Sequence, residues 1–308
     1  MPIMNITKRI ITFLICTVLT LSLVCIPAAA AYSGKTYYIN TAQELADIRG
    51  NGSYRLGTDI DMTGFDWDGI KSFSGTLDGN GYTISNLSSD KGLFGTLKSG
   101  AVIKNVRLEN CTIVTDSKYI GAIASYIPAN AENVQILNCS VNGTVETRYA
   151  NTSRMNFCGA LVGVAKSASA VVSECRSGAY VAAKYGVGGL VGLNYGTVEK
   201  SAFTGYLSHY GNDHINCSCG ELHKTLAYTA RIQGGICAVN RGTVTGSAVL
   251  AYMKEAEYIG MISGIDIKGY GSVKDCIALN DCGEWTEEPS KYNAVSNILS
   301  SKEYKKVG

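Results

Sequence analysis

The residues with the densest set of metal-ligand side chains form the segment 207–232. It contains every histidine of the chain and two cysteines, in the order His209, His214, Cys217, Cys219 and His223. Neutral imidazole and thiolate are zinc ligands, and four of these side chains could complete a tetrahedral site. However, the Cys-x-Cys spacing is tighter than in most zinc sites, and there is no His-Glu-x-x-His pattern. A loop-closing disulfide and an ordinary exposed loop are the alternatives.

The acidic stretch from Asp59 to Asp68, DIDMTGFDWD, is a second candidate site. Calcium prefers several carboxylate and carbonyl oxygens, which such a loop can supply. The spacing differs from that of an EF-hand, because no Glu closes the loop at the required position. The alternative is a turn next to an end cap, in which the carboxylates accept hydrogen bonds from nearby backbone amides.

Carboxylates that face outward from the repeats described below are the third candidates. Hydrolysis of a glycosidic bond needs two carboxyl groups that flank it. Glu109, Glu174 and Glu199 occupy such positions among lysines and arginines, and the sequence has no Asp-Asp pair. We expect these glutamates to be solvated strand residues and the chain to have no catalytic centre.

Charge and an N-terminal segment limit the class of protein. The 308 residues include 27 Lys and Arg and 25 Asp and Glu. Two of the basic residues, Lys8 and Arg9, precede an apolar run from Ile10 to Ile26 and four alanines at 28–31, as in a secretory signal. We expect cleavage of this signal, a permanent anchor being the alternative. Since the remainder is neutral and has no second long apolar run, we expect a secreted or cell-surface protein with no nucleic-acid partner and no membrane span after cleavage.

An internal repeat organises the rest of the chain. Short Gly-rich apolar segments recur, as in GALVG at 159–163 and GGLVG at 188–192. Their central residues form a column of large aliphatic side chains: Leu93, Ile123, Leu161, Leu190, Ile236 and Ile262. A second column follows: Leu108, Ile136, Val172, Val198, Val244 and Val273. Three residues later comes a third: Cys111, Cys139, Cys175, Ser201, Ser247 and Cys276. Columns that keep phase indicate a solenoid, in which equivalent residues stack to make a continuous core.

The repeats consist of strands. They are short, rich in Val, Ile, Thr and Tyr, and alternate with period two, as in Thr197-Val198-Glu199. Turns such as Asn142-Gly143 separate them, and no repeat contains a helical period. The sequence therefore predicts an all-β solenoid with about three strands in each coil and neighbouring coils about 4.8 Å apart.

The pattern GGLVGLNYGTV at 188–198 resembles the GLUG motif of bacterial secreted and surface proteins. The block from Phe73 to Leu87, followed by GLFG at 92–95, resembles the entry into the same repeats. Similar repeats occur in the N-terminal region of IgA-cleaving metallopeptidases, and the resemblance here covers residues 37–282, without the protease domain. It implies a right-handed parallel β-helix similar to that of pectin-lyase-like proteins, and it implies little about function.

A solenoid needs closed ends, because an open end exposes strand edges and core. Thr41 and Glu44 form a capping-box pattern that predicts a helix over 42–49, and Tyr54–Asp61 is expected to be the first strand. A second helix is predicted over 291–299. We therefore divide the chain into a signal peptide (1–31), an N-terminal cap with the first strand (32–68), the β-helix with GLUG-type repeats (69–282) and a C-terminal cap or linker (283–308).

The third column can be interpreted in two ways. Export favours disulfides, but stacked strands hold their Cβ vectors parallel, which is poor geometry for that bond. Ser201 and Ser247 in the same column favour a buried ladder of small side chains. Catalysis by a cysteine needs a positioned base, and the histidines lie elsewhere. The sequons Asn110-Cys111-Thr112 and Asn138-Cys139-Ser140 lie in this inward column, so we expect ladder residues there and not glycan sites.

These observations favour a binding module. The 19 tyrosines could stack on sugars, although tyrosine is also common at exposed strand positions. We expect an adhesin-like, secreted or cell-surface protein that presents the loops 145–156 and 207–232 to an extracellular glycan or protein. One alternative is a polysaccharide lyase or hydrolase. The other is a purely structural stalk, which predicts neither a pocket nor an aromatic cluster.

Overall fold

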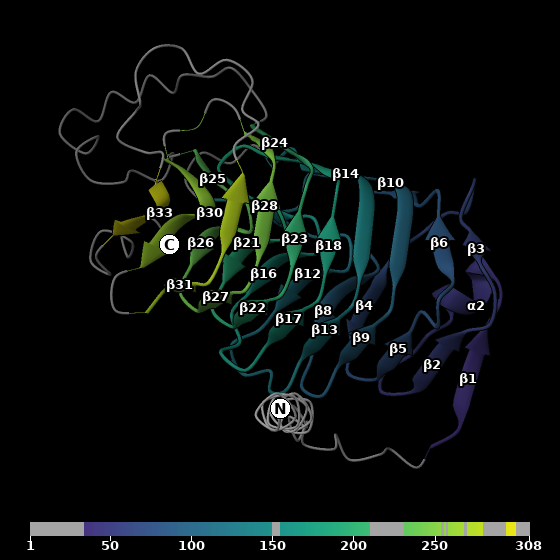
Figure 1. Cartoon of the computed structure of the whole chain (residues 1–308). Helices are drawn as coiled ribbons and strands as arrows, with labels where there is room; N and C mark the ends of the chain where they lie inside the picture. Colours follow the sequence, from purple (N-terminus) through teal and green to yellow (C-terminus); the bar gives the residue numbers. More distant parts are fainter. Residues whose placement is uncertain are drawn as a thin grey trace, which may run out of the picture. The chain divides into compact units, whose positions relative to one another are not determined.

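The computed structural model describes residues 34–149, 155–209, 231–253, 256, 258–267, 270–279 and 294–299, the last of these as backbone only. The chain divides into two compact units, Met1–Lys35 and Thr36–Gly308. The predicted signal peptide lies outside the described residues. No helix within the described ranges combines the length and apolar character that crossing a membrane requires. The second unit contains the repeats and is a parallel β-helix (Figure 1).

Three sheets run along the β-helix, and every strand pairing between successive coils is parallel. Sheet A consists of β1 (Thr36–Ile39), β2 (Ser53–Leu56), β5 (Thr76–Asp78), β9 (Val102–Lys104), β13 (Gln135–Leu137), β17 (Val171–Ser173), β22 (Thr197–Glu199), β27 (Thr243–Thr245) and β31 (Ser272–Lys274). The first strand is thus Thr36–Ile39, so the prediction of a first strand over Tyr54–Asp61 is wrong. That segment is divided between β2 and a separate two-residue strand, which belongs to sheet B.

Sheet B follows sheet A in each coil and contains two long strands, β10 (Arg107–Thr115) and β14 (Ser140–Thr147), which lie side by side in Figure 1. Later coils replace the long strand by two short ones, because β18 and β19 both pair with β14. The other strands are β3 (Ile60–Asp61), β6 (Thr83–Ser85), β7 (Ser88–Ser89), β18 (Arg176–Ser177), β19 (Tyr180–Ala183), β23 (Ala202–Phe203), β24 (Tyr206–His209), β28 (Ala248–Leu250), β29 (Tyr252–Met253) and β32 (Ile277–Leu279).

Sheet C completes the coil and is folded over on itself, so that successive strands of one coil belong to its two limbs. The first limb has β11 (Tyr119–Ile120), β15 (Phe157–Gly159), β20 (Gly186–Gly188) and β25 (Ile232–Gly234). The second has β4 (Ile70–Phe73), β8 (Phe94–Leu97), β12 (Ala124–Ile127), β16 (Val162–Ala165), β21 (Val191–Asn194) and β26 (Cys237–Asn240). The ten-residue β30 (Tyr258–Ile267) pairs with both limbs, and β33 (Ala294–Leu299) pairs with β30.

The first predicted column forms the centre of the core. Its six residues, Leu93, Ile123, Leu161, Leu190, Ile236 and Ile262, are all fully buried. Backbone hydrogen bonds of 2.8–3.0 Å join successive members from Ile123 onward, for example from the amide of Leu190 to the carbonyl of Ile236. Stacking these side chains keeps apolar surface out of water along the whole axis, which no single repeat could do.

The predicted columns need a correction in their first repeat. The register of sheet A pairs Ile136 with Ile103, so Leu108 is not the first member of the second column. The register of sheet B aligns Cys139 with Val106, which places Val106 at the start of the third column. Cys111 is buried, but it lies opposite Gly143 in a separate column. From Cys139 to Cys276 the third column is stacked in the order that the sequence gives.

The Gly-rich repeats make the sharp bend between the limbs of sheet C. Gly159, Gly188, Gly234 and Gly260 are in register on the first limb. A Cβ atom added to Gly188 would lie 1.9 Å from the carbonyl oxygen of Val191, within the same coil, so only glycine permits this approach. Side chains from both limbs then meet in a second apolar cluster, which includes Phe157, Leu193 and Val239.

The helix at the N-terminal end, α2 (Ala42–Ala46), is shorter than predicted. Thr41 is its N-cap and accepts a hydrogen bond from the amide of Glu44, whose carboxylate accepts one from the amide of Asn40. Leu45 is fully buried beneath the end of the solenoid. The helix predicted over 291–299 is wrong, because residues 294–299 form β33 along β30. Pairing with the open strand edge outweighs local helix propensity there.

Candidate functional site

A row of three stacked tyrosines, two exposed and one half-buried, is the most distinctive surface feature of sheet B. Tyr180, Tyr206 and Tyr252 occupy equivalent positions on β19, β24 and β29. Their rings stack with centroids 5.6 Å and 4.5 Å apart and interplanar angles of 21° and 17°. Tyr180 and Tyr206 are each 37% exposed, and Tyr252 is half-buried. We call these three residues the tyrosine row.

Local sequence explains why the row faces outward. Each tyrosine is followed by an aliphatic residue, and those three residues, Val181, Leu207 and Met253, are buried in the core. Alternate side chains of a strand point to opposite faces, so the burial of one set exposes the other. Each tyrosine also comes five residues after a member of the third column, as Tyr206 does after Ser201. That phase in the sequence could have revealed the row, but the sequence analysis did not use it.

A small basic pocket lies on the same sheet where sheets A and B meet. It has a volume of about 130 Å³ and is lined by Gly81, Asn105, Val106, Arg107, Asn138, Ser140 and Arg176. Arg107, Ser140 and Arg176 are in register on three successive coils, so Ser140 lies between the two arginines along the sheet. Guanidinium groups bind carboxylate and sulfate-like oxygens through paired hydrogen bonds.

Two asparagine side chains, Asn105 and Asn138, line this pocket where sheets A and B meet. Asn105 and Asn138 both have left-handed backbone conformations, with φ of 55° and 49°. The Nδ2 of Asn138 donates to Oδ1 of Asn105, whose own Nδ2 donates to Asp78 at 2.9 Å. Burial alone would raise the pKa of Asp78, but these hydrogen bonds and the nearby cations outweigh it and lower that pKa. Asn110 of the other sequon donates to Asn86 at 2.7 Å in the same way, but both sequon asparagines are exposed and do not point inward as expected.

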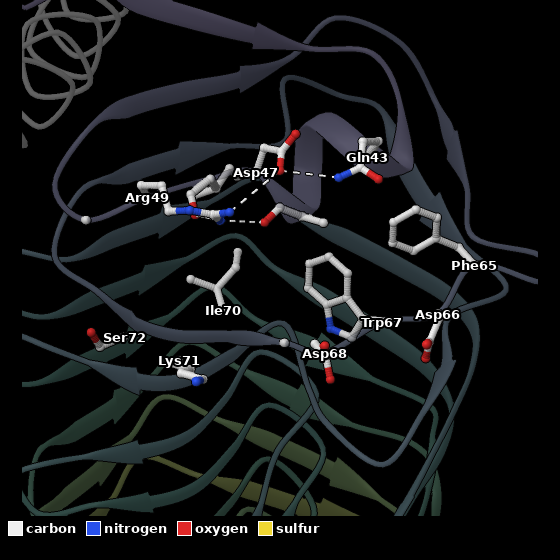
Figure 2. A pocket seen from close by; sticks show the side chains of 14 residues that line it. Gln43, Asp47, Arg49, Phe65, Asp66, Trp67, Asp68, Ile70, Lys71 and Ser72 are labelled. Carbon is white, nitrogen blue, oxygen red and sulfur yellow. Dashed lines mark hydrogen bonds and ion pairs between the residues drawn. The ribbon is translucent and has the colours of Figure 1, made fainter.

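A larger cavity lies at the N-terminal end, between α2 and the segment 65–72 (Figure 2). Its volume is about 600 Å³, and Trp67 and Phe65 lie on one side of it. Trp67 is buried and its Nε1 donates to the carbonyl of Gly92 at 3.0 Å, so the indole supports the end of the solenoid. Arg49 forms an ion pair with Asp47 at 3.6 Å. Trp67, Arg49 and Asp47, which line this cavity, are therefore already engaged in contacts that hold the N-terminal end of the solenoid together.

The acidic segment 59–68 makes separate local contacts. The Oδ1 of Asp61 accepts hydrogen bonds from the amide of Thr63, from its hydroxyl and from Asn86. Asp59 accepts from the amide of Thr83, and Asp68 lies 3.4 Å from Lys91. Each of these three carboxylates thus has its own partners, which for Asp59 and Asp68 lie in the next coil. The expectation of calcium binding stays a prediction.

Of the five predicted zinc ligands, only His209 is among the described residues; His214, Cys217, Cys219 and His223 lie outside them. Its Nδ1 is 3.1 Å from the carbonyl oxygen of Ala183. Burial lowers the pKa of His209 to about 4, so its ring is neutral at pH 7. Within the described ranges, no group of three or more His, Cys, Asp or Glu side chains could hold a metal ion.

The third column is a continuous hydrogen-bonded ladder. Each side chain donates to the carbonyl two residues before it, from Cys175 to Ser173 at 3.3 Å and from Ser201 to Glu199 at 2.7 Å. Each also accepts from the amide of the preceding coil: the amide of Cys175 donates to Ser201 Oγ at 3.1 Å, and the amide of Ser201 donates to Ser247 Oγ at 3.2 Å. The described cysteines are free thiols. Burial raises the pKa of Cys139 well above its usual value, which makes this thiol unreactive.

The outward glutamates do not converge. Glu109 accepts from Nδ2 of Asn142 at 3.0–3.1 Å, and Glu199 accepts from the hydroxyl of Ser173 at 3.0 Å. Glu174 lies at the corner between sheets A and B with a positive φ of 57°. Glu109 and Glu199 are therefore held on different coils by neutral partners.

Comparison with known proteins supports the fold and little more. No family model matches the chain. It is 37% identical over 117 residues to Halomucin from Haloquadratum walsbyi, a match that covers 31% of this chain and 1% of that protein. Its structure resembles the crystal structure of a putative immunoglobulin A1 protease from Bacteroides ovatus, with a TM-score of 0.55 and 18% identity over 89% of this chain and 86% of that one. At this identity the likeness concerns the fold alone.

Proposed function

We propose that this protein is a secreted or cell-surface β-helix module that binds an extracellular glycan through the tyrosine row and has no catalytic centre. The observation that carries the proposal is the stacking of aromatic rings on three successive coils, two of them exposed. Aromatic rings with polar tips bind the apolar faces and hydroxyl groups of sugars. A purely structural stalk would not need such a row.

Three observations support location outside the cell and membership of the GLUG-repeat proteins. The sequence begins with a predicted secretory signal. The bend at Gly188 and Val191 gives the glycines of the GGLVG pattern a steric role. The similar proteins are named Halomucin and a putative immunoglobulin A1 protease.

The absence of a catalytic centre is part of this proposal. Hydrolysis would need two carboxyl groups on either side of one bond. The outward Glu109 and Glu199 hydrogen-bond to Asn142 and Ser173 on their own parts of the surface. An assay for shortened chains after incubation with bound polysaccharide tests this point, and we expect the chain length to stay constant.

A glycan array with the purified exported protein tests the binding function. The wild type is compared with Tyr180→Ala/Tyr206→Ala/Tyr252→Ala and with Tyr38→Ala, a matched control whose tyrosine is 59% exposed on sheet A. We expect glycan binding by the wild type and the control and its loss in the triple variant. Binding that survives in a folded triple variant would contradict the proposal, as would binding to proteins alone.

A further inference from the structure

We propose that the glycan bound by the tyrosine row is an acidic polysaccharide, and that Arg107 and Arg176 bind its carboxylate or sulfate groups. This inference rests on the proposed function, because it names the class of glycan that the same face takes. It starts from the basic pocket of about 130 Å³ at the edge of sheet B.

The two arginines are placed to act on one anionic group. They are separated by one coil, which carries Ser140, so their Cα atoms are roughly 10 Å apart at the usual strand spacing. Arginine side chains are long enough to converge over the serine hydroxyl from both sides. The Asn105 and Asn138 side chains line the same pocket, although their hydrogen bonds to each other and to Asp78 hold them in place.

The charges of the pocket are not balanced by the protein. Among the described residues, neither Arg107 nor Arg176 forms an ion pair, whereas Arg55 and Arg148 pair with Asp78 and Glu146 at 3.0 Å and 2.8 Å. The glutamate nearest to Arg107 in sequence, Glu109, is hydrogen-bonded to Asn142. Glu174, two residues before Arg176, lies at the corner between sheets A and B, and no ion pair joins it to Arg176 among the described residues. An uncompensated pair of guanidinium groups favours an anionic ligand.

The pocket and the tyrosine row belong to one binding face. On β14, Ser140 pairs with Arg176 and Thr144 pairs with Tyr180. Four residues of a strand span roughly 13 Å, so a polymer a few sugar units long can reach from the arginines to the first tyrosine ring. Ser140 and Thr144 lie on the same side of β14, because side chains two and four residues apart share a face.

The test compares three polymers of known charge: dextran, which is neutral, dextran sulfate, and polygalacturonate, which carries carboxylates. Binding by the exported protein is titrated at low and high salt. We expect the wild type to bind both charged polymers at least about fivefold more tightly than dextran at low salt, and the difference to shrink as salt screens the contact. A difference between the two charged polymers identifies the preferred anion. Equal binding of all three polymers would overturn the inference.

Variants separate this inference from the proposed function. Arg107→Gln/Arg176→Gln should lose the preference for charged polymers and keep the binding of dextran, while Arg49→Gln, at the solenoid end, should keep both. If the double variant retains the preference and Tyr206→Ala abolishes all binding, the arginine site is refuted and the tyrosine site stands. If the double variant loses the preference while Tyr206→Ala binds normally, the proposed function fails and the arginine site stands.

Discussion

The rings of Tyr206 and Tyr252 stack with centroids 4.5 Å apart, although a long insertion separates the two residues in the sequence. The contact exists because β24 and β29 are adjacent in sheet B, with Tyr206 in register with Tyr252. The solenoid thus brings residues of one repeat phase together whatever the length of chain between them. The same principle gives rise to the core column, the bend and the thiol-hydroxyl ladder.

Removing a core side chain tests the first column. We expect Leu190→Ala to lower the free energy of unfolding by about 2–5 kcal/mol, because a fully buried leucine leaves a cavity. Leu190→Asp should unfold several coils, since it buries an unpaired charge. Leu250→Ala is the matched control, because Leu250 is 43% exposed, and it should cost less than about 0.5 kcal/mol. Urea titration gives these values, and equal effects at 190 and 250 would refute the core assignment.

Adding a methyl group at the bend tests the role of the repeated glycines. Gly188→Ala would place a Cβ atom 1.9 Å from the Val191 oxygen, so the backbone must shift. We expect a loss of about 1–3 kcal/mol or more in the free energy of unfolding. At Gly178 the nearest atom to an added Cβ is a side-chain oxygen of Asn142 at 3.0 Å, so Gly178→Ala should cost less. A smaller loss at 188 than at 178 would mean that the bend tolerates side chains.

Substitution at Ser201 tests the hydrogen-bonded ladder. Ser201→Ala leaves the buried amide of Cys175 without its acceptor, which should cost about 1–3 kcal/mol. Ser201→Cys keeps a side chain that can donate and accept, as the thiols of the same column do, and should cost less than half as much. Chemical denaturation of both variants provides the comparison. If alanine and cysteine were equivalent at this position, small size alone would explain the column.

Acid sensitivity tests the ion pairs of Asp78. Its carboxylate lies 3.0 Å from Arg55 and 3.6 Å from Lys104, and its pKa is lowered in the folded protein. Because the native pKa is below the unfolded value of about 3.9, this stabilisation is present above that pH and is lost as the pH falls through the native pKa. We expect Asp78→Asn to be less stable than the wild type by roughly 2 kcal/mol at pH 7, with the gap closing below about pH 4.

The control for this prediction is Asp66→Asn, which removes an exposed carboxylate of the cavity rim and should change the free energy of unfolding by less than about 0.5 kcal/mol. Stability is measured by denaturant titration between pH 7 and pH 2.5. A gap between wild type and Asp78→Asn that stays constant over this range would show that the charge of Asp78 does not matter.

The sequence predicts the core from Ile123 onward because burial forces equivalent residues into phase. It misleads in the first repeat, where Leu108 and Cys111 have the same spacing as Ile136 and Cys139. The true partners are Ile103 and Val106, and a register shift in β10 between Leu108 and Cys111 places Cys111 in a separate column. A spacing alone cannot distinguish two apolar pairs that lie five residues apart.

The site is less accessible to sequence reasoning than the core. Outward residues carry no burial constraint, so Arg176 and Tyr180 look like ordinary polar and aromatic strand positions. Their place in one binding face is visible only from the strand register, which pairs them with Ser140 and Thr144 in the preceding coil. The sequence predicts a helix over 291–299 for a related reason: the strand at 294–299 forms by pairing with β30, and local sequence does not show that partner.

The affinity of Tyr206→Ala for a glycan that the wild type binds is the most direct test of the account. Tyr206 is the central ring of the tyrosine row, so its loss removes both stacking contacts and part of the binding face. Calorimetric titration should give a dissociation constant at least about tenfold higher than for the wild type, equivalent to about 1.4 kcal/mol. If Tyr206→Ala kept the wild-type melting temperature and the wild-type dissociation constant, glycan binding by the tyrosine row would be contradicted.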